Sequence, residues 1–348
     1  MILEGKLGRI IVGRNAVNNL REEIGRINPS KVFIVTDKCV GRIWFEHVLG
    51  KMGLEGKIEK FEINTGERGK SLSTVNMLWK KLIEGGFTRK SLALALGGGV
   101  VGDVTGFIAS TFMRGIYFAQ IPTTLLAQVD SSIGGKNGIN FHGKNMIGTF
   151  YQPLFTIIDT KFIGTLPENE FLNGMAEVIK YGIICDKAFF NFIEEKIEAI
   201  KKREVDVLQQ VVESCVKMKV DIVSMDEREE GLRRILNFGH TFGHAIEKLS
   251  NYRIKHGYAV SIGMVMACKV AEKILDFKQT NDVIKLLKKV GLPITTKINF
   301  NKIVEETVRD KKAWYGKTVL ILPEEIGKVS VVEVERNKLL DALRGGHS

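Results

Sequence analysis

The sequence predicts an α/β domain with a mainly parallel sheet, followed by a mainly α-helical domain. Two observations support this prediction. Short apolar, β-branched runs alternate with helical spacing up to about residue 160, which is typical of parallel strands joined by helices. After Pro167 nearly every segment has helical spacing. We therefore expect two domains, residues 1–163 and 164–348, with the junction near 160–166.

Each expected element follows from its local pattern. Strands are expected at 7–13, 32–37, 91–96, 117–121 and 155–158, with helices at 15–25 and 72–85. In the second part, helices are expected at 168–182, 187–200, 204–225, 239–249, 257–274 and 280–290. A short β pair at 318–322 and 328–333 and a helix at 336–344 would end the chain.

Composition excludes several classes of protein. Of 348 residues, 44% are hydrophobic and 26% charged, which is typical of a globular protein and excludes a disordered one. Charge-free apolar stretches such as Gly257–Cys268, with about 12 residues, are too short to cross a bilayer. No N-terminal targeting pattern is visible, so we expect no membrane partner.

Charge and cysteines point to a cytoplasmic protein without a nucleic-acid partner. The net charge is +11, but Lys and Arg are spread along the chain and form no single stripe. The four cysteines show no CxxC spacing, so we expect free thiols in a reducing compartment.

A glycine-rich stretch indicates a nucleotide site. Residues Gly97–Asp103 match GxGxxG between an expected strand and an expected helix, where backbone without Cβ lets phosphate approach the helix N-terminus. The pattern does not follow the first strand, and no acidic residue stands about 20 positions downstream. Asp37, at the end of an earlier strand, could bind the ribose instead. A tight strand–helix turn is the alternative interpretation, and the nearby Glu67–Lys70 could equally be an exposed turn.

Clustered histidines indicate a metal site. His240 and His244 are four residues apart, which puts both rings on one face of a helix, and His256 follows shortly afterwards. Glu177 is a charged residue within an apolar helix and could add a carboxylate. Spacing alone favours His240 and His244 as a ligand pair. It leaves open whether one of them faces a substrate, or whether the rings are ordinary core or surface residues.

The stretch from Arg114 to Asn145 is dense in residues that bind anions. It contains Arg114, Thr123, Thr124, Asp130, Ser131, Ser132, Gly134, Gly135, Lys136, Lys144 and Asn145. It has no P-loop pattern. Lys180, Lys219 and Arg233 stand in segments whose other residues look buried, which favours a functional role over a solvated surface.

These motifs together resemble a known family. The blocks that match are Gly97–Asp103, Arg114–Ile116, Gln120–Ser132, Gly134–Lys136, Gly143–Gly148, Ala176–Gly182, Leu236–Glu247 and His256–Gly257. Over residues 30–330, roughly, the chain resembles the 3-dehydroquinate synthase family of sugar phosphate cyclases. The resemblance implies a Rossmann-like N-terminal domain, a helical C-terminal domain, and a cleft between them for NAD, a divalent metal (zinc or cobalt) and substrate.

The resemblance also implies residue roles. Glu177, His240 and His256 would hold the metal, with His244 turned to the substrate, which replaces the pair that spacing favours. NAD would contact Asp37, Glu67, Lys70, Gly98, Gly99, Val100, Asp103, Thr123, Thr124, Lys136 and Lys144. Substrate would contact Arg114, Lys136, Asn145, Lys219, Arg233, Asn237, His244 and Lys311 or Lys312, with Asp130, Lys180 and His244 as catalytic groups. In the family, an arginine at the Arg114 position reaches across a homodimer interface.

The implied substrate is 3-deoxy-D-arabino-heptulosonate 7-phosphate, a phosphorylated sugar acid of the shikimate pathway. Transient oxidation by NAD, phosphate elimination, re-reduction and aldol closure would give 3-dehydroquinate. The alternatives are another sugar phosphate cyclase or polyol dehydrogenase, and a non-enzymatic nucleotide-binding module. Lys219 and Arg233 favour a substrate that bears a carboxylate. Asn137 and Tyr258 depart from the family pattern, where Thr and Glu are common.

Overall fold

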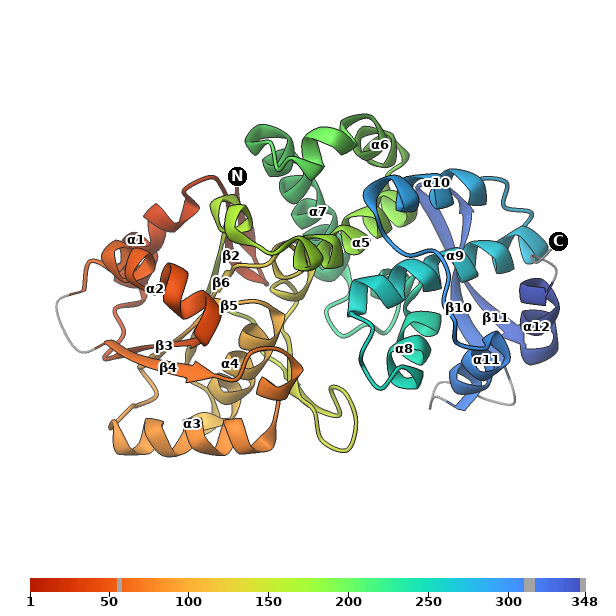
Figure 1. Cartoon of the computed structure of the whole chain (residues 1–348). Coiled ribbons are helices and arrows are strands. Elements are labelled where there is room, and N and C mark those ends of the chain that lie inside the picture. Colours follow the sequence, from red (N-terminus) through yellow and green to blue (C-terminus); the bar gives the residue numbers. More distant parts are fainter. Residues whose placement is uncertain (55–57, 310–316, 345–348) are drawn as a thin grey trace. The chain divides into compact units, whose positions relative to one another are not determined.

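The chain forms two compact units. The computed structural model describes residues 1–54, 58–309 and 317–344. Unit 1 comprises Met1–Leu166 with Leu208–Ser224, and unit 2 comprises Pro167–Val207 with Met225–Ser348 (Figure 1). The junction after Leu166 lies three residues beyond the expected one after residue 163. The segment Leu208–Ser224 packs with unit 1, although the sequence analysis places it in the second domain.

Unit 1 is built on a seven-stranded sheet. Its order is β1-β2-β9-β6-β5-β3-β4, and every pair is parallel except β1 with β2. The strands are β1 (Ile2–Gly5), β2 (Gly8–Gly13), β3 (Val32–Asp37), β4 (Ile58–Ile63), β5 (Leu92–Gly97), β6 (Tyr117–Pro122) and β9 (Phe155–Asp159). All residues of β3, β5 and β9 are buried, as their continuous apolar runs require of strands covered on both faces.

Helices cover both faces of this sheet (Figure 1). Alternate side chains of β3 divide between two cores, because successive residues of a strand point to opposite faces. Ile34 packs with residues of α1 (Leu20–Ile27) and α2 (Lys38–Met52). Phe33 and Val35 pack with residues of α3 (Leu72–Glu84) and α4 (Gly99–Thr111). The predicted α/β layer is therefore confirmed.

A hairpin and several short turns complete unit 1. The hairpin pairs β7 (Lys136–Ile139) with β8 (Ile147–Phe150), and β7 packs on α4. The short helices are η1 (Ala16–Asn19), η2 (Glu67–Gly69), η3 (Phe112–Arg114), η4 (Ala127–Ser131) and η5 (Thr160–Thr165). The hairpin, β1, α2 and β4 have no counterpart in the elements expected from the sequence, and neither has the later helix Phe300–Arg309.

Unit 2 is mainly helical, as predicted. Its elements are α5 (Glu168–Cys185), α6 (Lys187–Lys201), the start of α7 (Val205–Met225), η6 (Leu232–Asn237), α8 (His240–Leu249), α9 (His256–Ile274), α10 (Thr280–Val290), α11 (Phe300–Arg309), α12 (Arg336–Arg344) and the hairpin of β10 (Lys317–Glu325) with β11 (Lys328–Glu335). Helix α9 is the core of the unit, because α5, α8, α10, α12 and β10 all pack against it. Its residues Gly257–Cys268 carry no charge and nearly all are buried, which is typical of a core helix.

Glycines bring α8 and α9 close together. A Cβ at Gly263 would lie 2.0 Å from the backbone oxygen of Gly239, and one at Gly243 would lie 3.2 Å from the backbone of Val260. Gly239 also has a φ of 76°, which favours glycine. Gly239 and Gly243, which stand beside His240 and His244, therefore allow the backbone of α9 to pack closely against α8. Within the described parts of the chain, no helix is long and apolar enough to span a membrane.

Candidate metal and nucleotide sites

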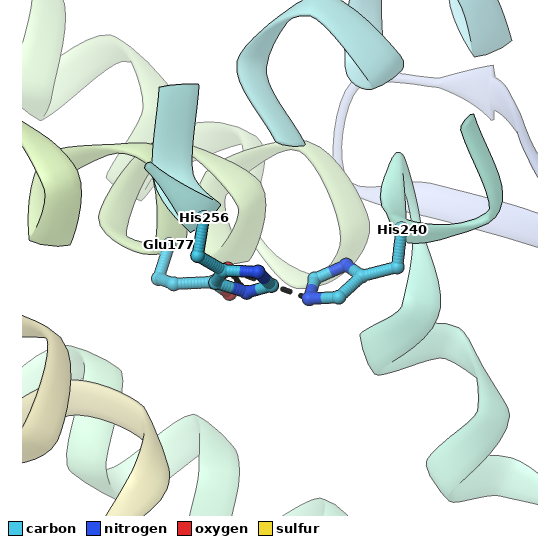
Figure 2. Close-up of side chains that lie close together, drawn as sticks. All are labelled: Glu177, His240 and His256. Atoms are coloured by element: carbon cyan, nitrogen blue, oxygen red, sulfur yellow. Dashed lines mark ion pairs between the residues drawn. The ribbon is translucent and has the colours of Figure 1, made fainter. Parts of the chain in front are cut away.

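Three side chains from three helices of unit 2 converge on one point. Glu177 lies on α5, His240 begins α8 and His256 begins α9 (Figure 2). The Nε2 atoms of His240 and His256 each lie 3.5 Å from Oε1 of Glu177. One ligand atom from each residue lies within 4.8 Å of the other two. The structure thus brings together the three residues that the resemblance implies as metal ligands.

Hydrogen bonds at the opposite ring nitrogens fix which nitrogen faces this point. The Nδ1 atom of His240 lies 3.1 Å from the carbonyl oxygen of Phe238, and Nδ1 of His256 lies 3.2 Å from Oε2 of Glu247. Because an oxygen accepts, Nδ1 of each ring acts as a donor, which leaves Nε2 as the nitrogen that can bind a metal beside Glu177. This is the arrangement of histidines that bind metal through Nε2.

The electrostatics of the cluster differ between its two rings. Burial lowers the pKa of His240 to about 3, so this ring is neutral near pH 7. Burial also acts to lower the pKa of His256, but hydrogen bonds that the ring donates to the carboxylates of Glu177 and Glu247, together with their charges, outweigh burial and raise the pKa to about 9. One carboxylate and two imidazoles suit a divalent ion such as zinc or cobalt at a catalytic site. The donor set therefore fits the expected metal.

His244 has a different place from the one that spacing favours. Its ring centroid lies 5.4 Å from that of His240, but it is exposed. Its ligand atom joins a second possible group, with Glu247 and His256. The group of Glu177, His240 and His256 is therefore the ligand set that the resemblance implies, and it does not contain the pair of His240 and His244 that spacing favours. Lys180 is fully buried beside the first group and forms an ion pair with Glu177.

The expected nucleotide residues of unit 1 lie at one edge of the sheet. Asp37 ends β3 and Gly97 ends β5, which are neighbouring parallel strands. The connection after β3 leads outward to β4, whereas that after β5 leads inward to β6, so the chain reverses direction here. Such a switch point at the carboxyl ends of the strands is where α/β sheets bind nucleotides. Thr123 and Thr124 follow the end of β6 at the same edge.

Close packing explains the glycines at this edge. A Cβ at Gly98 would lie 2.9 Å from the Thr124 side chain, and one at Gly99 would lie 2.8 Å from Oγ of Ser131. Gly98 caps α4 without a side chain, so the N–H groups at the start of this helix stay accessible to an anion. Asp37 caps α2, because its Oδ1 accepts the N–H groups of Cys39 and Val40. Its other oxygen remains available to a ribose.

A polar network connects expected nucleotide and substrate residues of unit 1. The buried ammonium of Lys70 forms an ion pair with Asp103 and donates to Oδ1 of Asn145 at 2.5 Å. Burial raises the pKa of Asp103, and the charge of Lys70 opposes that effect. Asn140 accepts from the backbone N–H of Asn145 and donates to Glu67 at 2.8 Å. The sequence analysis does not identify Asn140, because this residue belongs to none of the motifs.

Other predicted substrate residues are held by nearby oxygens. Lys219 donates to Oδ1 of Asp130 at 2.6 Å and to its carbonyl oxygen at 2.7 Å, both within unit 1. In unit 2, Arg233 is buried and donates to the carbonyl oxygen of Glu227, and Asn237 donates to Glu229.

The remaining predicted residues are exposed, partly exposed or outside the described part of the chain. Arg114, with a φ of 66°, and Lys136 are exposed. Lys144 lies 3.7 Å from Glu67. Lys311 and Lys312 lie outside the described residues. The roles assigned to all these residues stay predictions.

Comparison with known proteins places the chain in a family. The "3-dehydroquinate synthase N-terminal" family matches residues 60–173, and the "3-dehydroquinate synthase C-terminal" family matches residues 174–313. A 3-dehydroquinate synthase of Pyrococcus abyssi is 46% identical over 329 residues, which are 94% of this chain and 96% of the relative.

Two solved structures share the fold along nearly the whole chain. One is a 2-deoxy-scyllo-inosose synthase with carbaglucose-6-phosphate, NAD⁺ and Co²⁺, with a TM-score of 0.88, 26% identity and 97% of each chain covered. The other is the 2-epi-5-epi-valiolone synthase ValA of Streptomyces hygroscopicus subsp. jinggangensis with NAD⁺ and Zn²⁺, with a TM-score of 0.88, 25% identity, and 99% of this chain and 97% of that one covered.

A Rossmann-like α/β unit and a helical unit that gathers a carboxylate with two imidazoles define the class of dehydroquinate synthase-like cyclases. Within that class, identity to the two solved cyclases is 26% and 25%, against 46% to the curated relative. The chain belongs to the 3-dehydroquinate synthase family. It is therefore an enzyme, a lyase that eliminates phosphate.

Proposed function

We propose that this chain converts 3-deoxy-D-arabino-heptulosonate 7-phosphate to 3-dehydroquinate and phosphate. Family membership supports the reaction, and the convergence of Glu177, His240 and His256 supports the chemistry. A zinc or cobalt ion held by these residues would polarise the substrate hydroxyls. NAD would supply a hydride acceptor that is reduced and reoxidised within each cycle.

The chain's own residues then bind and orient the substrate. We propose that Lys219 and Arg233 bind its carboxylate, and that Asp130 and Lys180 contact its ring hydroxyls. Lys180 is suited to this role because its buried charge is compensated by Glu177. The phosphate would contact Lys136, Asn145, Asn237, His244 and Lys311 or Lys312. Fixed ammonium and guanidinium groups stabilise charge that develops during elimination, and fixed contacts favour the conformer that closes the ring.

Unit 1 would be the NAD-binding domain. The switch point between β3 and β5 and the accessible start of α4 support this assignment. The proposed NAD contacts are Asp37, Glu67, Lys70, Gly98, Gly99, Val100, Asp103, Thr123, Thr124, Lys136 and Lys144. We further propose a cytoplasmic homodimer in which Arg114 contacts the substrate of the partner subunit.

The test is incubation of the protein with the heptulosonate phosphate, a trace of NAD and a divalent metal, while phosphate and dehydroquinate are measured together. We expect equal amounts of both products and many turnovers per NAD. His256→Ala should abolish turnover and leave NAD affinity unchanged. Phosphate release without dehydroquinate, or faster turnover of a sugar phosphate that lacks a carboxylate, would contradict the proposed reaction.

A further inference from the structure

His256 is held at both ring nitrogens by carboxylates. Its Nε2 lies 3.5 Å from Oε1 of Glu177, and its Nδ1 lies 3.2 Å from Oε2 of Glu247. Glu247 is only 3% exposed and lies on α8, seven residues after His240, so it shares that residue's face of the helix. A carboxylate is costly to bury, and its retention here calls for a physical reason.

The two ligand histidines differ in what accepts their Nδ1 proton. For His240 the acceptor is the carbonyl oxygen of Phe238, which belongs to the neighbouring backbone and cannot be lost by substitution. For His256 it is the side chain of Glu247, on a different helix. A charged acceptor strengthens the hydrogen bond and makes Nε2 a stronger donor to a metal. At Nδ1, the orientation of His256 therefore depends on a side chain from another helix.

We propose that Glu247 is the positioning residue for His256. It keeps the proton on Nδ1, aims Nε2 at the point shared with Glu177 and His240, and raises the affinity of that point for a divalent cation. This inference rests on the proposed function in one respect, since it requires a metal at these three residues. It does not depend on which sugar phosphate the enzyme uses.

Glu247 also belongs to the second possible metal-binding group, which suggests a competing role for it. Ligand atoms of His244, Glu247 and His256 also lie within 4.8 Å of one another, so Glu247 could itself bind a cation. That arrangement would require Nδ1 of His256 to give up its proton and its hydrogen bond to Glu247. A bridging imidazole deprotonated at both nitrogens is less favourable than a neutral ring, so we favour the positioning role. Metal stoichiometry distinguishes the two.

The test compares Glu247→Ala and Glu247→Gln with the wild-type protein in Co²⁺ titrations against a competing chelator. We expect one equivalent to bind in each, with affinity reduced about 10- to 100-fold by Glu247→Ala. Glu247→Gln should lie between, because its amide oxygen can still accept the Nδ1 proton but carries no charge. The visible spectrum of bound Co²⁺ should change in Glu247→Ala, and turnover with saturating metal should fall less than affinity does.

Lys248→Ala is the matched control. Lys248 is the next residue of α8, is exposed and pairs with Glu306, so its removal should leave Co²⁺ affinity unchanged. Wild-type affinity in Glu247→Ala would overturn the proposal even if its unfolding midpoint fell. The proposal would also be overturned if the wild-type protein bound two equivalents of Co²⁺ and both Glu247→Ala and Glu247→Gln lost only the second. Metal binding without turnover of the heptulosonate phosphate would instead contradict only the proposed function, and a wild-type protein that binds no Co²⁺ would overturn both.

Discussion

Oδ1 of Asn173 accepts a hydrogen bond of 2.7 Å from the backbone N–H of Gly257, the second residue of α9. Asn173 lies four residues before Glu177 on α5, so one face of α5 supplies both a proposed ligand and a cap for the helix that begins with His256. A Cβ at Gly257 would lie 2.0 Å from the carbonyl oxygen of Asn173. The start of α9 is therefore fixed to α5 by both backbone and side chain.

Asn173→Ala should weaken both stability and metal binding. The N–H of Gly257 would lose its acceptor, which costs about 1 kcal/mol in the free energy of unfolding. His256 would lose its fixed backbone, so metal affinity should fall about tenfold. Urea unfolding of the metal-free protein and a chelator competition measure the two effects.

Ser71→Ala is the control for Asn173→Ala. Ser71 caps α3 in unit 1, where its side chain accepts the N–H of Thr74. This variant should lose similar stability with unchanged metal affinity. If both variants lowered metal affinity equally, the effect would be a general loss of stability and not the position of His256.

Gly263→Ala should separate α8 from α9. The new methyl group would overlap the carbonyl oxygen of Gly239, which lies 2.0 Å from the ideal Cβ position. Such overpacking costs about 1–3 kcal/mol, and it would move His240 relative to His256, so metal affinity should also fall. Gly25→Ala is the control, because nothing lies within 4 Å of a Cβ there and alanine favours the helix. An unchanged metal affinity in Gly263→Ala would show that helix spacing does not set the ligand geometry.

Patterns of apolar residues predicted the fold well because burial in this protein follows local periodicity. Helix α10 was expected at 280–290 and spans Thr280–Val290, and the buried strands β3 and β5 were also identified. Strand β4 was not, since Glu59, Lys60 and Glu62 interrupt its apolar residues at the edge of the sheet. The β7–β8 hairpin was not either, because its Gly, Asn and Lys residues indicated anion binding more strongly than strands.

The candidate site shows where sequence patterns fail. Spacing on one helix predicts that His240 and His244 act together, but the partners of His240 come from α5 and α9. Sequence patterns identified Glu177 and His256 as candidates for the same site, but only the resemblance to the family assigned both of them to His240 as its partners. Asn173 and Glu247 follow from neither, because each acts through a contact between helices that are distant in sequence. Packing, and not local pattern, decides these contacts.

Metal binding should release a proton near neutral pH. Burial lowers the pKa of His240 to about 3. For His256, hydrogen bonds donated to Glu177 and Glu247 outweigh burial and raise the pKa to about 9 in the metal-free protein. At pH 7.5 only His256 must lose a proton before it can bind, so about one proton should leave per ion. Apparent affinity should rise with pH up to about 9 and then level off.

Calorimetry in buffers of different ionisation enthalpy measures this proton count. His244→Ala should give the same count, because His244 is not in the proposed ligand set. Affinity that does not change between pH 7 and 9 would show that His256 is already neutral in the metal-free protein or does not bind the ion.

Arg233→Ala should mainly raise the substrate concentration required. Arg233 is only 3% exposed, its guanidinium donates to the carbonyl oxygen of Glu227, and its backbone N–H donates to Oδ2 of Asp226 at 2.9 Å. The side chain is therefore fixed before substrate binds. A hydrogen bond between charged groups contributes about 1.5–3 kcal/mol, so KM should rise about 10- to 100-fold while kcat changes less.

Two further variants separate the charge of Arg233 from its shape and position. Arg233→Lys keeps the charge but loses the planar fork, so its KM should lie between those of the wild-type protein and Arg233→Ala. Arg234→Ala removes an exposed neighbour on η6 and should behave as wild type. Steady-state kinetics with the heptulosonate phosphate give these values. If Arg233→Ala matched Arg234→Ala, this guanidinium would not bind the substrate carboxylate, and a cyclase whose substrate lacks that group would become the better assignment.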